Sequence, residues 1–136
     1  MQTPVSKGDT KMQTTALGLS PRASMALAIL AALERQDRAR HPSEIEIEDI
    51  SKFLFKLHEA RIDIGDVALR RVPGGFYSED VENLIGHYLA SGRAQQMSPV
   101  RFTPEGVDFL RKIVDNEKKT NPQAIEIATR VLALNP

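Results

Sequence analysis

The side chains that most often do chemistry are sparse in this sequence and far apart. His41, His58 and His87 show no metal-ligand spacing, and His58 begins no His-Glu-x-x-His motif because position 62 is Ile. Asp63-Ile64-Gly65-Asp66 places two carboxylates beside a glycine, which is far more often a turn than a cation site. The sequence therefore predicts no metal site.

Nucleophiles, bases and phosphate-binding loops are equally hard to assemble from this chain. Gly74-Gly75 lacks the Gly-x-x-x-x-Gly-Lys-Ser/Thr pattern of a phosphate-binding loop, and no serine stands in a nucleophile elbow. The chain has no cysteine, which excludes disulfides and thiolate nucleophiles. We expect a protein that is not an enzyme and that uses no cofactor.

Composition narrows the classes of partner. The 136 residues include 18 Lys or Arg and 18 Asp or Glu, so there is no overall excess of cations to neutralise phosphates. No run approaches the roughly 18 apolar residues of a membrane span. The apolar stretch from Met25 to Leu33 fits a first core helix better than a signal peptide, since its apolar residues repeat every four positions. The sequence predicts a cytoplasmic domain that does not bind membranes.

Periodicity divides the first half of the chain into a tail, a helix, a strand and a second helix. Residues 1–19 have no periodicity and predict a flexible tail, with a binding arm as the alternative. Ser20-Pro21 begins a helix that runs to about Gln36. Polar and apolar residues alternate over 44–47, and the apolar spacing then becomes helical to about residue 60. Residues 61–77 predict a short strand followed by a turn at Pro73-Gly74-Gly75.

The second half contains the most regular helix of the sequence, over about 79–91. Ser78 is a good N-cap, and Val81, Leu84, Ile85, Tyr88 and Leu89 form an apolar stripe. A hairpin turning at Ser98-Pro99 follows over 94–102, then a helix that opens at Thr103-Pro104, a polar break over 115–120 and a last helix over 121–134. We expect a mainly α protein with a small β-hairpin (α+β) and about five helices, organised as a domain over 20–116 and a separate C-terminal helix.

This order of elements resembles that of winged-helix domains. Three segments are also similar to winged-helix-like bacterial proteins of the Panacea and related phage-associated groups: Ile50-Ser51-Lys52-Phe53-Leu54-Phe55, Gly74-Gly75-Phe76-Tyr77-Ser78 and Phe102-Thr103-Pro104-Glu105-Gly106. The resemblance covers about residues 24–114 and implies a regulatory, antitoxin-like or adaptor-like role. The chain departs from a DNA-reading helix-turn-helix because about 17 residues, rather than three or four, separate its two central helices.

The helix over 79–91 would be the DNA-reading helix of such a domain, and its residues suit DNA poorly. Glu79, Asp80 and Glu82 repel phosphates, and only Asn83 and His87 offer donors to bases. For a DNA-binding transcriptional regulator, which is the alternative function, the candidate contacts are Arg70, Arg71, Arg93 and Arg101.

Two surfaces suit protein partners better, and we expect a non-enzymatic regulatory module that acts by protein–protein binding. On the helix over 79–91, the small residues Gly86 and Ala90 lie four apart and leave a notch, flanked by Asn83 and His87. On the last helix, the apolar residues form two stripes, of which Ile125, Ala128 and Leu132 would face the domain. The second stripe predicts a homodimer interface formed by Ile127, Val131 and Leu134.

Overall fold

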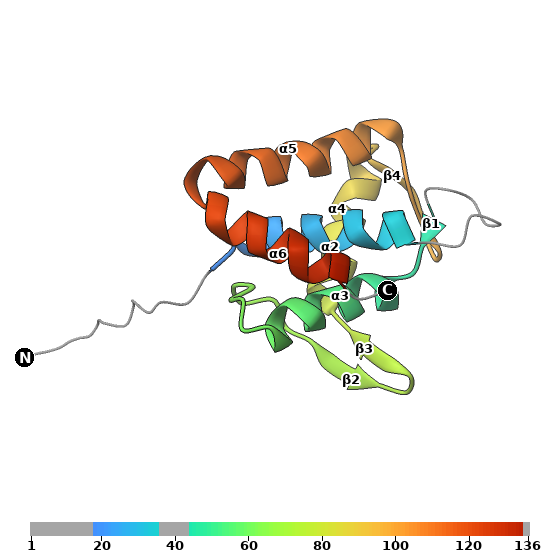
Figure 1. Ribbon diagram of the computed structural model, residues 1–136. Coiled ribbons are helices and arrows are strands. Elements are labelled where there is room, and N and C mark those ends of the chain that lie inside the picture. Colours follow the sequence, from blue (N-terminus) through green and yellow to red (C-terminus); the bar gives the residue numbers. More distant parts are fainter. Residues whose placement is uncertain (1–17, 36–43, 135–136) are drawn as a thin grey trace, which may run out of the picture.

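The computed structural model describes residues 18–35 and 44–134, and in this part of the chain five helices pack together with a small amount of antiparallel sheet at their edge (Figure 1). This confirms the predicted fold class, mainly α with a small β element. The helices are α2 (Pro21–Arg35), α3 (Ile47–Glu59), α4 (Glu79–Ala90), α5 (Pro104–Thr120) and α6 (Pro122–Leu134). The strands are β1 (Glu44–Ile45), β2 (Arg70–Val72), β3 (Gly75–Tyr77), β4 (Ala94–Met97) and β5 (Val100–Phe102).

Side-chain caps begin three of the helices at the positions that the sequence predicts. The Ser20 hydroxyl accepts a hydrogen bond from the Ala23 amide at 3.2 Å, before α2. Ser78 accepts from the Val81 amide at 3.3 Å, and Thr103 accepts from the Gly106 amide at 3.0 Å. Each cap satisfies an amide that has no partner inside its helix, so the starts of α2, α4 and α5 are encoded locally.

Helix α2 is the centre of the core. It packs against α3, α5 and α6, and Figure 1 shows it between α5 and α3. Ala23, Ala26 and Ala28 are fully buried on it, and these small side chains let neighbouring helices approach closely. The larger side chains that fill the remaining space and are completely buried include Ile29, Ile50, Leu54, Leu57, Ile85 and Leu110.

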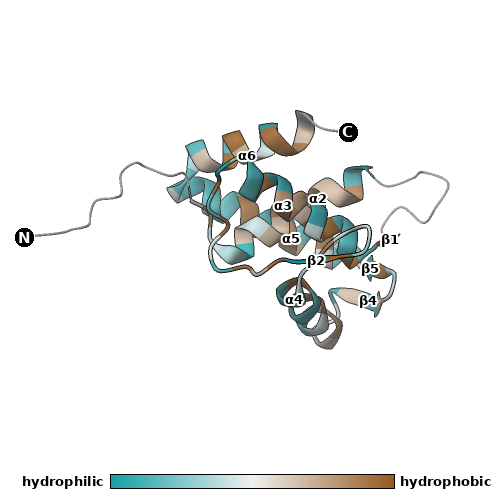
Figure 2. Ribbon diagram, turned by 90° about the horizontal axis from the view of Figure 1, so that it is seen from below, coloured by the Kyte–Doolittle hydropathy of each residue, from teal (hydrophilic) through white to brown (hydrophobic). Residues whose placement is uncertain are grey.

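The larger sheet joins both halves of the domain. Its strand order is β1-β5-β4, all antiparallel, with Ile45 opposite Val100 and Met97 also opposite Val100. The β4–β5 hairpin, called the wing below, spans Ala94–Phe102 and turns at Ser98-Pro99, as the sequence predicts. Figure 2 shows β4 and β5 beside α4, which is the helix that precedes them.

The predicted N-terminal tail extends two residues too far. Most of it, residues 1–17, lies outside the described residues. Leu19, however, is only 4% exposed and belongs to the core, and its amide donates to the Asp63 carbonyl at 2.8 Å. Gly18 forms a parallel bridge with the same residue. The domain therefore begins by residue 18 rather than after residue 19.

The predicted polar break over 115–120 and the domain end at 116 are wrong. These residues form the last part of α5, because Glu117, Lys118 and Lys119 are good helix formers on a solvated surface. Helix α6 packs against α2, α3 and α5. Ala124 is 3% exposed and lies in the core with Ile125, Ala128 and Leu132.

Candidate functional site

Helix α3 carries one aromatic side chain outside its buried stripe. Leu54 and Leu57 are fully buried, whereas Phe55 is half-buried on the neighbouring face. The ring of Phe76, on β3, stacks on the ring of Phe55 with their centroids 4.0 Å apart and their planes 16° apart. Such a pair contributes about 0.5–1.5 kcal/mol beyond simple burial. The pair therefore holds the β2–β3 hairpin against α3.

The β2–β3 hairpin lies where a helix-turn-helix would have a short turn. Pro73 and Gly74 make its two-residue loop, and Gly74 has a φ of +88°, which favours glycine. The strand that the sequence predicts near residues 67–72 forms only over Arg70–Val72. Figure 1 shows this hairpin extending away from the helices, below α3.

The loop over residues 61–69 is fixed at both ends. Ile62 and Ile64 are buried and anchor it to the core. Gly65 has a φ of +79°, and a Cβ atom there would lie 2.6 Å from Cγ of Pro21, so only glycine fits. At the far end, the Ala68 amide donates to Oδ2 of Asp80 at 2.7 Å. The loop is therefore held against both α2 and α4.

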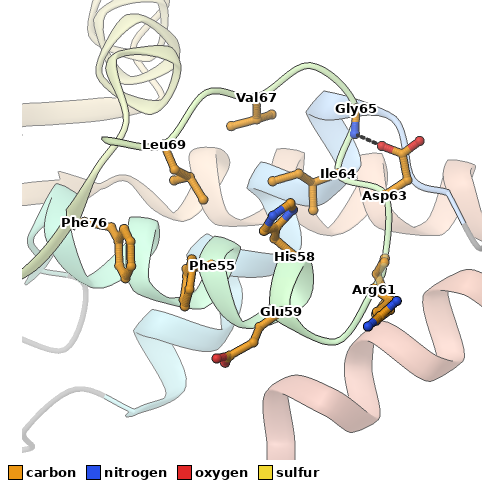
Figure 3. A pocket seen from close by; sticks show the side chains of 11 residues that line it. Phe55, His58, Glu59, Arg61, Asp63, Ile64, Gly65, Val67, Leu69 and Phe76 are labelled. Atoms are coloured by element: carbon orange, nitrogen blue, oxygen red, sulfur yellow. Dashed lines mark hydrogen bonds between the residues drawn. The ribbon is translucent and has the colours of Figure 1, made fainter. Parts of the chain in front are cut away.

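Between α3, this loop and β3 lies an open groove of about 980 Å³ (Figure 3). Figure 3 shows the stacked rings of Phe55 and Phe76 at one end and Asp63 at the other. Eleven described residues line it: Phe55, His58, Glu59, Arg61, Ile62, Asp63, Ile64, Gly65, Val67, Leu69 and Phe76. We call it the α3–β3 groove.

The lining of the α3–β3 groove combines an apolar floor with a charged rim. Phe55, Val67, Leu69 and Phe76 are half-buried apolar side chains, and the charged groups at the rim are exposed. The polar side chains of the rim are those of His58, Glu59, Arg61 and Asp63. An apolar floor with a polar rim is typical of surfaces that accept apolar side chains of another polypeptide.

The predicted partner-binding residues of α4 lie together on one polar surface. Asn83, His87 and Ala90 are exposed, and Gly86 is partly exposed with open space where its Cβ would be. A hollow of about 210 Å³ lies beside them, lined by Pro21, Met25, Asp66, Val67, Asp80, Asn83, Leu84 and His87. Met25, Val67 and Leu84 give this hollow apolar walls, but it is much smaller than the α3–β3 groove.

The four arginines proposed for DNA binding lie in two separate places, Arg70 and Arg71 on β2 and Arg93 and Arg101 at the start of the wing and on it, and each already has a partner. On β2, Arg70 pairs with Glu79 at 2.8 Å and lies over the Tyr77 ring, while Arg71 lies over the Phe76 ring. At the wing, the Arg93 guanidinium lies 3.7 Å from the centroid of the Phe109 ring, and Arg101 forms an ion pair with Glu44.

The stripe of α6 predicted to form a dimer is partly covered within the domain. Ile127 and Val131 are half-buried and pack against the core, so less apolar area faces outward than the sequence indicates. Leu134 ends α6, and its side chain lies outside the described part of the structure.

Metal sites and membrane spans can be checked over the same residues. Within residues 18–35 and 44–134, no three His, Asp or Glu side chains come together as metal ligands. His58 lines the α3–β3 groove, His87 lies on α4, and His41 lies outside the described residues. No helix in this part of the chain has the length and apolar character needed to cross a membrane.

Sequence reasoning missed the α3–β3 groove altogether. One signal was present: Phe55 lies beside, not in, the apolar stripe of α3, so a further element must cover it. Val67 and Leu69 alternate with polar positions, and Phe76 follows a turn. The sequence pattern does not predict the path of the loop, because that path depends on the tertiary contacts that Gly65 makes with Pro21 and Asp80 makes with the Ala68 amide.

Comparisons of the chain with protein-family models, with curated proteins and with solved structures give no match. The family resemblance drawn from three short segments therefore stays a prediction.

Proposed function

We propose that this protein is a non-enzymatic, winged-helix-like regulatory module that binds a protein partner through the α3–β3 groove. The observation that carries the proposal is the half-buried apolar lining formed by Phe55, Val67, Leu69 and Phe76 in an open groove of about 980 Å³. Apolar surface that stays in contact with water forgoes a burial free energy of about 25 cal/mol for each Å². A partner that covers it with apolar side chains gains that free energy.

The winged-helix assignment is supported by the order α2, β1, α3, α4, β4, β5 and by the sheet order β1-β5-β4. The β2–β3 hairpin between α3 and α4 departs from a DNA-reading arrangement, because it adds a structured insertion between the two central helices. This insertion forms one wall of the groove. The β2–β3 hairpin is thus the cause both of the departure from the DNA-binding pattern and of the candidate protein-binding surface.

The groove is a better candidate than the α4 surface that the sequence favours. Protein interfaces depend on a few large, well-packed apolar or aromatic side chains at their centre. The α4 surface has Asn83, Gly86, His87 and Ala90, none of which is a large apolar side chain. The groove has two stacked phenylalanines.

Capture of partners from native lysate, after removal of nucleic acid, tests the proposal. The full chain carries a tag and is compared with the variant Leu69→Asp, which places charge in the groove and leaves the hollow beside α4 unchanged. The matched control is Ala90→Asp, on the exposed α4 surface. We expect the groove variant to lose the captured proteins and the control to retain them, with thermal melts showing that both are folded.

The opposite result, loss with Ala90→Asp and retention with the groove variant, would move recognition to α4. Capture that neither substitution changes would contradict both assignments. Because both variants introduce Asp at partly or fully exposed positions, the comparison controls for added charge.

Antitoxin-like or adaptor-like activity is a narrower form of the same proposal, and self-association through α6 is a separate one. Ile127 and Val131 are the residues that we propose for the self-association interface. Light scattering on the full chain and on Ile127→Glu with Val131→Glu measures it: a dimer that the double variant abolishes supports self-association, and a monomer at high concentration contradicts it.

A further inference from the structure

The chain enters the domain at the rim of the α3–β3 groove. Gly18 forms a parallel bridge with Asp63, and the next residue, Leu19, donates its amide to the Asp63 carbonyl at 2.8 Å. Asp63 itself lines the groove. A Cβ atom on Gly18 would lie 3.7 Å from Cβ of Asp63, so the two backbones run in close contact. The residues that precede Gly18 therefore start beside the groove.

This point of entry is held firmly. Leu19 is 4% exposed. The Ser20 amide and hydroxyl donate to the two carboxylate oxygens of Glu117 at 2.9 and 3.1 Å. Burial acts to raise the pKa of Glu117, but the hydrogen bonds from Ser20 and Asn121 outweigh it and leave that pKa below its usual value. The Glu117 carboxylate thus fixes where the N-terminal segment begins.

The preceding segment has side chains that match the groove. Leu17 is adjacent to Gly18, and Met12 lies six residues before it, within about 20 Å of extended chain. Both are apolar, as is the groove floor. Lys7, Lys11 and Asp9 give residues 1–17 a side-chain charge of +1, whereas Glu59, Asp63 and Arg61 give the exposed rim of the groove a charge of −1.

We propose that residues 1–17 dock back into the α3–β3 groove through Met12 and Leu17 and so compete with a partner for it. A tethered segment experiences an effective concentration of about 1 mM, so even weak contacts populate the docked state. A partner then binds only the fraction of molecules in which the groove is open, so its apparent affinity falls in proportion to that fraction. The regulatory part of this inference rests on the proposed function; the docking itself does not.

A spin label on the N-terminal segment tests docking in the full chain. The chain has no cysteine, so Gln13→Cys gives a single site for a nitroxide. We expect the label to broaden the methyl resonances of Ile64, Val67 and Leu69 at least about threefold more than that of Met97 on the wing, because the tether keeps the segment close. Adding Met12→Asp to the labelled chain should remove most of this difference.

Two results would overturn the inference. Equal broadening of the groove methyls and of Met97 means that the segment does not dock. Broadening that persists when labelled protein is mixed with a separate isotope-enriched, unlabelled copy means that a second chain fills the groove.

The same variant separates this inference from the proposed function. If both hold, Met12→Asp without the label captures partners about threefold more strongly than the unmodified chain. If the label docks but no variant captures any protein, the proposed function fails and docking stands. If capture requires Leu69 while the label never reaches the groove, docking fails and the function stands.

Discussion

The α4 surface and the α3–β3 groove differ in what they leave exposed. On α4, the exposed positions include Asn83 and His87, and the first turn is acidic. In the groove, stacked Phe55 and Phe76 remain half-buried beside Leu69, with charge confined to the rim. The surface that the order of elements would assign to DNA carries acidic and polar side chains, whereas the inserted hairpin forms one wall of a groove lined by apolar side chains. Position in a fold therefore indicates function less well than the side chains found there.

The largest expected effect comes from the side chain beneath the α4 surface. Ile85 is fully buried, so Ile85→Ala should lower the free energy of unfolding by about 2–5 kcal/mol. Leu84, its neighbour in sequence, is only partly buried, and Leu84→Ala should cost roughly half as much. Urea denaturation measures both. Equal losses would mean that the buried face of α4 is rotated from the one described, and with it the exposed surface compared above.

Two glycine-to-alanine substitutions should have smaller effects on stability. The effect should be a loss at the base of the wing and a gain on the α4 surface. A Cβ atom on Gly106 would lie 2.0 Å from the carbonyl oxygen of Arg93, so Gly106→Ala must displace backbone at the base of the wing. We expect a loss of about 2–3 kcal/mol. Gly86 has open space at the same position, so Gly86→Ala should gain about 0.5–1 kcal/mol from helix propensity.

Thermal unfolding of the two glycine variants provides the measurement. Destabilisation by Gly86→Ala would show that something packs into the α4 notch, as in a dimer, and would weaken the contrast with the groove. A neutral Gly106→Ala would mean that the wing is less tightly joined to α5 than its backbone contacts indicate.

Features set by local rules could be predicted from the sequence, and those set by distant contacts could not. The caps at Ser78 and Thr103 and the turn of the wing follow from residue types and near neighbours. The last part of α5 was missed because polarity alone does not separate a solvated helix from a loop; Glu117 is held there by Ser20, 97 residues away in sequence. The groove was missed because its loop follows contacts to Pro21 and Asp80.

A modest effect is expected at Glu117, which fixes the chain where it reaches the groove. Glu117→Gln removes the charge from hydrogen bonds made by Ser20 and Asn121, and should cost about 1 kcal/mol at neutral pH. Because the pKa of Glu117 is lowered in the folded state, its contribution is present above the unfolded pKa and is lost as pH falls through the folded pKa. The difference between the two proteins should therefore vanish in acid.

Glu126→Gln is the matched control for Glu117→Gln, because Glu126 makes an exposed ion pair with Arg130 on α6. Its effect should stay below about 0.5 kcal/mol at every pH. Urea denaturation as a function of pH gives both values. A constant loss at Glu117 from neutral to acid pH would show that its charge does not stabilise the fold.

The smallest effect is expected for DNA binding, and the contrary result would reverse the comparison between the α4 surface and the α3–β3 groove. We expect no specific DNA binding tighter than weak micromolar at physiological salt, and less than about a twofold change when Arg93→Ala and Arg101→Ala are combined. Arg101 is paired with Glu44, Arg93 is stacked on Phe109, and DNA binding would have to break both contacts and bring phosphates towards the acids of α4. Breaking each of these contacts costs free energy, which reduces the net gain from a new contact with a phosphate. Fluorescence anisotropy with random-sequence duplexes, followed by selection from a sequence library, measures affinity and its salt dependence. A nanomolar, sequence-selective complex that falls steeply with salt and disappears in the double variant would make α4 and the wing the functional surface and the protein a DNA-binding regulator.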